Sequence, residues 1–198
     1  DYLIFVIPSA FIHQELEKLK ASLDGKVIIS AIKGIVPESS LIVGEHFNNY
    51  FNVAFDDIGV ISGPCHAEEV ALERLSYLTI ACADDTKASI VADHLSCDYI
   101  KCNISDDVMG TEYAAMLKNI YAIAAGIAHG LGYGDNFQSV LMSNAIREMK
   151  RYVKKVHKMK RDINDSAYLG DLLVTGYSVF SRNRMFGNMI GKGYTVKS

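Results

Sequence analysis

The sequence predicts an α/β domain followed by an all-helical domain, and two observations carry this prediction. In residues 1–106, short apolar runs alternate with helical patterns, which is typical of a mostly parallel sheet with helices on its faces. In residues 107–198, only helical patterns occur, and the first of them is rich in alanine. We therefore place the domain boundary near Asp106.

Five strands are expected in the first domain, because five short apolar runs are bounded by turn residues. The first run, LIFVI, has the continuous apolar character of a strand buried on both faces, and Pro8 ends it. Asp24-Gly25 turns the chain into the second strand. The expected strands are residues 3–7, 26–32, 58–61, 77–83 and 99–102.

Helices are expected to join these strands. Ser9 is expected to cap a helix that extends to Leu19, because serine hydroxyls accept hydrogen bonds from the free N–H groups at helix starts. Pro37-Glu38 is expected to begin the second helix, and Asp84-Asp85 is expected to cap the third.

The second domain is expected to contain two long helices, at residues 108–128 and 136–160, and shorter ones after Asp165 and Asn183. The segment from Arg147 to Arg161 holds eight of the chain's 20 lysines and arginines, with apolar residues at helical spacing. This pattern predicts an amphipathic helix with a cationic face in solvent. Membrane or nucleic-acid binding by that face is the less favoured alternative.

The composition is that of an ordinary globular protein. The 198 residues are 49% hydrophobic and 22% charged, and the net charge of -3 gives no general indication of nucleic-acid binding. No apolar run has the length of a transmembrane helix, and the first apolar run is too short for a signal peptide.

The cysteines lack metal-ligand spacing, so we expect free thiols, no metal site and a cytoplasmic location. They are Cys65, Cys82, Cys97 and Cys102.

Two lysines are candidates for proton chemistry. Lys118 lies in a helix of small and apolar residues, where a lysine either extends to solvent or is held inward for chemistry. Lys33 directly follows the second strand, and ligands of open α/β sheets bind beyond the carboxyl ends of strands. Taken alone, Lys33 is more simply interpreted as a solvated loop lysine.

Two turns are candidates for anion binding. Residues 62–69, SGPCHAEE, make a Gly-Pro turn into a helix whose first N–H groups favour anions, although plain turn chemistry explains the pattern equally well. Residues 181–184, SRNR, offer the planar fork of arginine, which matches phosphate oxygens in pairs. At most one of the two arginines is expected to meet a ligand, because they do not share a helix face. Catalysis by Cys65 with His66 is disfavoured for the same reason.

Six short motifs follow one another along the chain. They are VIPS (Val6 to Ser9), AIKG (Ala31 to Gly34), SGP-x-x-A (Ser62 to Ala67), LKN-x-x-AIAAG (Leu117 to Gly126), GDL-x-x-T (Gly170 to Thr175) and SRNR-x-FG (Ser181 to Gly187). Together they resemble the NAD(P)-dependent glycerol-3-phosphate dehydrogenases of the bacterial type, and the last three are close to family-specific. The resemblance implies that residues 1–106 form the second part of a Rossmann-type parallel sheet and that residues 107–198 form a helical substrate domain.

The resemblance also implies roles for the matching residues. Lys118 is the implied proton donor and acceptor, and Lys33 assists it near the substrate and the cofactor. The implied substrate contacts are Lys33, Gly63, Cys65, Lys118, Asp171, Ser181, Arg182 and Asn183. The implied cofactor contacts are Lys33, Ala67 and Arg182, while Thr175 supports the lysine–aspartate region.

The implied reaction is the reversible reduction of dihydroxyacetone phosphate to sn-glycerol 3-phosphate with NAD or NADP as cofactor, feeding glycerophospholipid synthesis. The corresponding partners are these small substrates and a second copy of the chain in a homodimer, with no nucleic acid and no membrane span. One alternative is an inactive remnant that binds a phosphate compound or a partner protein. Another is a sister hydroxyacid dehydrogenase of the same architecture.

The sequence departs from the family pattern in three places. The Gly-rich fingerprint expected before the first strand is not in the sequence, and neither is the family's C-terminal segment. We therefore expect the chain to be a fragment, and the choice between NAD and NADP stays open. Cys65 stands where the family usually has serine or threonine, and a thiol is a weaker hydrogen-bond donor.

Overall fold

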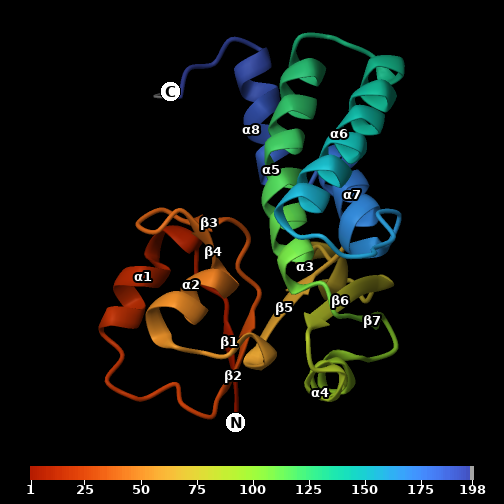
Figure 1. The fold of residues 1–198 in the computed structure, drawn as a ribbon. Coiled ribbons are helices and arrows are strands. Elements are labelled where there is room, and N and C mark those ends of the chain that lie inside the picture. Colours follow the sequence, from red (N-terminus) through yellow and green to blue (C-terminus); the bar gives the residue numbers. More distant parts are fainter. Residues whose placement is uncertain (197–198) are drawn as a thin grey trace.

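The computed structural model describes residues 1–196 and shows an α/β part from which a helical part extends (Figure 1). The α/β part is built on a five-stranded sheet in the order β1-β2-β5-β6-β7. All neighbouring strands are parallel except β5 and β6, which are antiparallel. The predicted fold class, a mostly parallel sheet followed by helices, is confirmed. The strands are β1 (Tyr2–Phe5), β2 (Val27–Ser30), β5 (Ile58–Ser62), β6 (Ser76–Cys82) and β7 (Ile100–Ser105).

Helices cover both faces of the sheet. Successive residues of a strand point to opposite faces, so Ile28 packs with α1 and α2 whereas Ile29 packs with α4. Asp84 caps α4 as predicted, because its carboxylate accepts hydrogen bonds from the N–H groups of Thr86 (2.9 Å) and Lys87 (3.2 Å). The helices of this part are α1 (Ser9–Glu17), α2 (Val43–Phe51), α3 (Ala67–Ala71) and α4 (Asp85–Leu95).

Three local predictions for this part are wrong. The first strand was expected to be buried on both faces, but β1 lies at an edge of the sheet and Ile4 is 51% exposed. A small antiparallel hairpin of β3 (Ile35–Val36) and β4 (Leu41–Ile42) occupies the place where Pro37 was expected to begin a helix. The hairpin turns because Ser40 has a left-handed backbone (φ 56°) and its N–H donates to the carbonyl oxygen of Val36 at 2.8 Å. Ser9 is the first residue of α1 rather than its side-chain cap, and the helix ends at Glu17, before Leu19.

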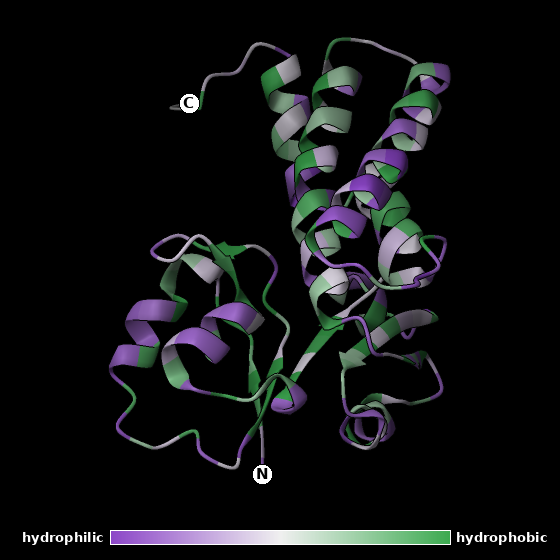
Figure 2. Ribbon diagram, viewed as in Figure 1, coloured by the Kyte–Doolittle hydropathy of each residue, from purple (hydrophilic) through white to green (hydrophobic). Residues whose placement is uncertain are grey.

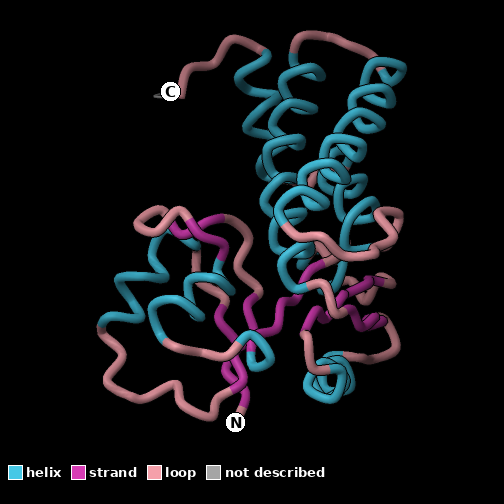
Figure 3. The backbone as a smooth tube through the Cα atoms, viewed as in Figure 1, coloured by secondary structure: helices cyan, strands magenta, loops and turns pink. Residues whose placement is uncertain are grey.

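The helical part is arranged around α5 (Val108–Gly130), which lies between α8 (Arg182–Gly191) and α6 (Asp135–Val156) (Figure 1). The shorter α7 (Asp171–Tyr177) follows a single π-helical turn at Ser166–Gly170 and packs against α5. Helix α6 ends before the expected residue 160, and the chain continues as a loop to Asp165 (Figure 3).

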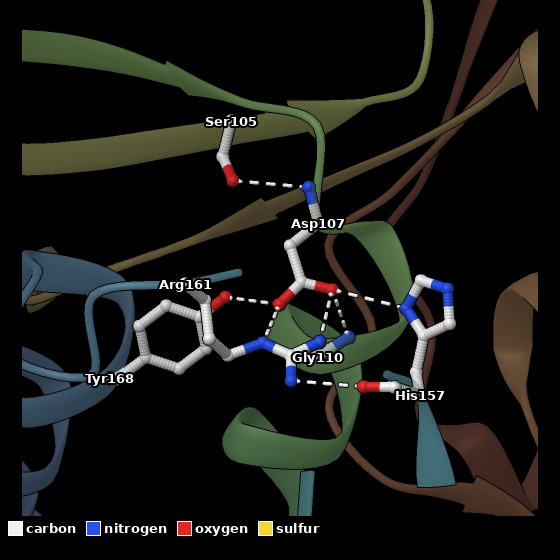
Figure 4. Close-up of polar contacts among 6 residues, drawn as sticks. All are labelled: Ser105, Asp107, Gly110, His157, Arg161 and Tyr168. Carbon is white, nitrogen blue, oxygen red and sulfur yellow. Dashed lines mark hydrogen bonds and ion pairs between the residues drawn. The ribbon is translucent and has the colours of Figure 1, made fainter. Parts of the chain in front are cut away.

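A buried carboxylate explains the early end of α6. Asp107 caps α5 by accepting a hydrogen bond from the Gly110 N–H at 2.9 Å, and it accepts others from Arg161 (Nη2 at 2.9 Å) and the Tyr168 hydroxyl at 2.5 Å (Figure 4). Burial opposes ionisation of Asp107, but these donors hold its pKa below the ordinary value. Arg161 reaches Asp107 only because the chain leaves the helix at His157, whose backbone is extended.

A second buried carboxyl joins the two parts of the molecule. Glu112 of α5 is 3% exposed, and its Oε2 accepts a hydrogen bond from the N–H of Gly44 at the start of α2 at 2.9 Å. Its other oxygen has no hydrogen-bond partner among the described residues. Burial, with a smaller contribution from Glu45, raises the pKa of Glu112 to about 8, so the carboxyl is largely protonated at neutral pH.

Replacing Glu112 with glutamine is expected to change how stability depends on pH. The folded protein holds a proton from about pH 4.5 to about pH 8 that the unfolded chain releases, so this carboxyl lowers the free energy of unfolding as pH rises through that window. Glutamine cannot ionise, so Glu112→Gln should gain stability relative to wild type by up to about 1.4 kcal/mol per pH unit there. Urea unfolding at several pH values measures this gain. If the free energy of unfolding changes with pH in the same way for the two proteins, the prediction is wrong.

Candidate active site

Close packing of α5 against α8 sets the frame of the site. A Cβ atom on any of four glycines would lie 2.0–2.4 Å from a backbone oxygen of the other helix. The helices run in the same direction, because Gly187 faces Ile123 and Gly191 faces Ile127 one turn later. The N-terminus of α8 therefore lies beside the turn of α5 that follows Lys118. The four glycines are Gly126 and Gly130 of α5 and Gly187 and Gly191 of α8.

Lys118 is held inward by Asp171. It is 6% exposed in the middle of α5, and its Nζ donates a short hydrogen bond to Oδ2 of Asp171, the first residue of α7, which is 2% exposed. Lys33, in the loop after β2, brings its Nζ to 3.7 Å from the same oxygen. Ser62 at the end of β5 donates to it at 3.3 Å. This carboxylate oxygen of α7 thus gathers groups from α5, from β5 and from the loop after β2.

The amine of Lys118 is poised between its two protonation states. Burial, and after it repulsion from the Lys33 ammonium, together lower the pKa of Lys118 from 10.5 to about 7, although Asp171 acts in the opposite direction. A lysine with a pKa near neutrality can both donate and accept a proton at the pH of the cell. The arrangement is therefore suited to acid–base chemistry at a ligand oxygen.

A cavity of about 210 Å³ opens beside Lys118. Its size suits a small ligand, because pockets for drug-sized molecules usually measure about 300–1,000 Å³. Every residue for which a substrate contact was predicted lines it, whereas Ala67, predicted only for the cofactor, does not. These lining residues are Lys33, Gly63, Cys65, Lys118, Asp171, Ser181, Arg182 and Asn183.

The turn after β5 supplies one wall of the cavity. Gly63 has a left-handed backbone (φ 123°), and a Cβ there would lie 2.7 Å from the carbonyl oxygen of Tyr77, so only glycine fits. Cys65 follows in the same wall. Burial raises the pKa of its thiol, which keeps the sulfur protonated and argues against a nucleophilic role.

The start of α8 supplies cationic and N–H donors opposite the lysine. The Ser181 hydroxyl caps the helix by accepting a hydrogen bond from the Arg184 N–H at 3.3 Å. Arg182 and Asn183 form the first turn, whose remaining N–H groups and positive dipole end favour an anion. Arg182 lines the cavity and Arg184 does not.

Sequence reasoning missed two residues of the cavity wall, Val174 and Phe180, and gave no role to Asn119. His66, which also lines the cavity, was considered only within the turn at residues 62–69 and as a disfavoured partner of Cys65. The rings of His66 and Phe180 lie 6.2 Å apart and join the Gly63 turn to the segment before α8. The one feature of the sequence that could have pointed to Phe180 is its position directly before the SRNR motif. Thr175 also lines the cavity, and its hydroxyl donates to the Asp171 carbonyl oxygen at 2.6 Å.

A larger cavity, of about 550 Å³, lies between the end of β7 and the loop after α6. Its buried ionisable groups, Asp107, Arg161 and Tyr168, are already bonded to one another (Figure 4). We therefore place the candidate active site in the smaller cavity. No cluster of three or more potential metal ligands occurs within residues 1–196.

Comparison with known proteins matches both parts of the chain to one family. Residues 1–88 match the model described as NAD-dependent glycerol-3-phosphate dehydrogenase N-terminus, and residues 107–198 match the corresponding C-terminus model. The glycerol-3-phosphate dehydrogenase [NAD(P)+] of Oceanobacillus iheyensis is 37% identical over 194 residues, or 98% of this chain, and that of Exiguobacterium sp. is 40% identical over 193 residues, or 95%. The chain spans 56% of the length of each relative.

Solved structures agree with these matches. Glycerol-3-phosphate dehydrogenase from Coxiella burnetii superimposes with a TM-score of 0.90 at 28% identity, over 99% of this chain and 60% of that one. The DsGPDH of Dunaliella salina gives a TM-score of 0.88 at 29% identity, over 97% of this chain and 33% of that one.

A methyl group between α5 and α8 is expected to destabilise the protein. The Cβ of Gly187→Ala would lie 2.1 Å from the carbonyl oxygen of Ile123, so the helices must separate, and overpacking of this kind costs about 1–3 kcal/mol. Gly170→Ala is the control, because its added Cβ would have no neighbour closer than 3.6 Å. Urea unfolding measures both variants. Equal stability of the two would show that the glycine contacts do not hold α8 in place.

Proposed function

This chain belongs to the NAD-dependent glycerol-3-phosphate dehydrogenase family, and we propose that it carries the substrate site of an enzyme that reversibly reduces dihydroxyacetone phosphate to sn-glycerol 3-phosphate. The observation that carries the proposal is a buried amine and an arginine on the start of a helix, facing one small cavity. A lysine suits a carbonyl oxygen, and an arginine at a helix N-terminus suits a phosphate.

Lys118 acts on the oxygen at C2 of the substrate. In reduction, negative charge develops on the carbonyl oxygen, and the ammonium form of Lys118 stabilises that charge and donates a proton. In oxidation, the neutral amine takes the proton from the C2 hydroxyl. The lowered pKa of Lys118 makes both forms available near neutral pH. Asp171 holds the amine in place, and Asp171 and Lys33 act in opposite directions on its proton affinity.

Arg182 and Asn183 bind the phosphate at the other end of the substrate. Their donors and the N–H groups of the first turn of α8 fix the phosphate away from the reacting carbon, which is positioning rather than chemistry. Gly63 and Cys65 form the wall along the carbon chain. The phosphate site favours phosphorylated three-carbon substrates over unphosphorylated hydroxy acids.

A nicotinamide cofactor, NAD or NADP, supplies the hydride when it is bound. Lys33 and Arg182 both bring cations to the cavity. Arg182 is exposed and has no ion-pair partner among the described residues, and the Lys33 side chain is 34% exposed although it pairs with Asp171. Such cations fit the phosphates of a dinucleotide. Ala67, exposed at the start of α3, offers no side chain that would obstruct the approach of a cofactor from that side.

We also infer the setting of the reaction. The glycerol 3-phosphate made here is proposed to feed glycerophospholipid synthesis, and a homodimer is proposed as the working form. The four cysteines are free thiols, which supports a reducing compartment such as the cytoplasm. No helix within residues 1–196 is long and apolar enough to cross a membrane.

Two measurements test the proposal together. Titration calorimetry of the chain with sn-glycerol 3-phosphate, with glycerol as the comparison, should show that binding requires the phosphate. In a protein of the relatives' full length that contains this chain, oxidation of NADH or NADPH should depend on dihydroxyacetone phosphate. Binding without turnover would favour a non-catalytic binding protein, and turnover of an unphosphorylated hydroxy acid would favour a sister dehydrogenase.

In a protein of the relatives' full length that contains this chain, Lys118→Ala is expected to reduce kcat by about 10²–10⁴-fold, the usual contribution of general acid–base catalysis. Removing the lysine also leaves Asp171 without its closest partner, so circular dichroism must show that the variant is folded. Lys192→Ala, an exposed lysine after α8, is the control and should keep wild-type kcat. A folded Lys118→Ala enzyme with more than about a third of wild-type kcat would refute the assignment.

Arg182→Lys is expected to raise KM for dihydroxyacetone phosphate about tenfold or more, although the charge is kept. Lysine presents a point charge where the phosphate fits the planar fork of arginine. The loss of one charge-assisted hydrogen bond, about 1.5–3 kcal/mol, corresponds to this change. Arg184→Lys makes the same replacement two residues away, outside the cavity, and should leave KM unchanged. If the two variants have equal KM values, Arg182 does not bind the phosphate.

A further inference from the structure

The basic residues of the chain are concentrated on one segment. Seven lysines and arginines lie within residues 147–160, with Glu148 as the one acidic residue. This segment carries a charge of +6, so the rest of the chain carries -9. All seven side chains are exposed, and none forms an ion pair with another described residue. They are Arg147, Lys150, Arg151, Lys154, Lys155, Lys158 and Lys160.

Three of these cations share the outer face of α6. Arg147, Arg151 and Lys154 follow one another at spacings of four and three residues, which places them on one side of a helix. The opposite side is buried against α5 and α7. Helix α6 lies on the side of α5 away from α8, so its outer face is turned away from the candidate active site (Figure 1). The buried residues on the inner side of α6 include Met142, Ala145, Met149 and Val153.

Exposed apolar residues continue the same face toward the start of α6. Phe137 and Val140 lie on the same side of the helix as the three cations, nearer to its N-terminus. They are 45% and 59% exposed. The ring of Phe137 packs edge-on against Tyr133, which is 51% exposed, with ring centroids 4.8 Å apart. Figure 2 shows both apolar and hydrophilic bands on the ribbon of α6, and the bands include its buried residues as well as its exposed ones.

We propose that the outer face of α6, formed by Phe137, Val140, Arg147, Arg151 and Lys154, binds the surface of an anionic lipid bilayer. Unpaired cations match lipid phosphates, and the exposed apolar residues fit the boundary between headgroups and acyl chains. A nucleic acid would use the cations but leave the apolar half of the face in water. The helix lies on the bilayer rather than across it.

Vesicle sedimentation tests the proposal on the chain itself. The chain should bind vesicles of phosphatidylcholine with one third phosphatidylglycerol far more tightly than vesicles of phosphatidylcholine alone, and high salt should release it. The triple variant Arg147→Gln, Arg151→Gln, Lys154→Gln should lower the partition coefficient about a hundredfold. The matched control Lys20→Gln, Arg74→Gln, Lys101→Gln, which removes the same charge elsewhere on the surface, should change it less than about threefold.

A second variant separates a bilayer from a nucleic acid. Phe137→Ser with Val140→Ser keeps every charge and should weaken vesicle binding about tenfold or more, because it removes the inserted apolar groups. The proposal is overturned if anionic vesicles do not bind, or if the charge control loses as much affinity as the triple variant. It is also overturned if the Phe137, Val140 variant binds vesicles like wild type while a short DNA duplex displaces them.

Discussion

The buried pair of Lys118 and Asp171 is the interaction on which the site depends. Two charges removed from water are stable only when they face each other and find further partners, and Ser62 and Lys33 reach the same carboxylate oxygen from the sheet. The pair therefore fixes α5 and α7 against the carboxyl ends of the strands. The two lysines, Lys118 and Lys33, share the single carboxylate of Asp171. The repulsion between these two cations contributes to lowering the pKa of Lys118.

Much of the fold could be predicted because its signals are local. Apolar runs bounded by turn residues predicted the five strands of the sheet, and Asp84 predicted the start of α4. The errors arose where distant residues decide the backbone. Nothing near Pro37 reveals the hairpin that ends at Ile42, and α6 stops early because Arg161 bonds to Asp107, 54 residues away.

The candidate site was predicted unevenly for a related reason. Lys118, Asp171 and Arg182 were predicted because they lie in motifs to which the family resemblance assigns roles. The structure brings all three to one cavity. The small residues around Lys118 indicated the close approach of a helix or a ligand but could not name α8 as the helix. Cavity residues such as Phe180 carry no chemical signal in the sequence, since their place follows from packing.

The protonation of Lys118 is the most direct test of this account. The chain is labelled with ¹³C and ¹⁵N in lysine, and the Lys118 signal is assigned by its absence in Lys118→Arg and followed by NMR as pH is raised. We predict a midpoint near pH 7, well below the ordinary value of 10.5, and a higher midpoint in Lys33→Met, where the repelling charge is gone. A midpoint at 10 or above in the wild-type protein would contradict it, because an amine that stays protonated cannot serve as the base.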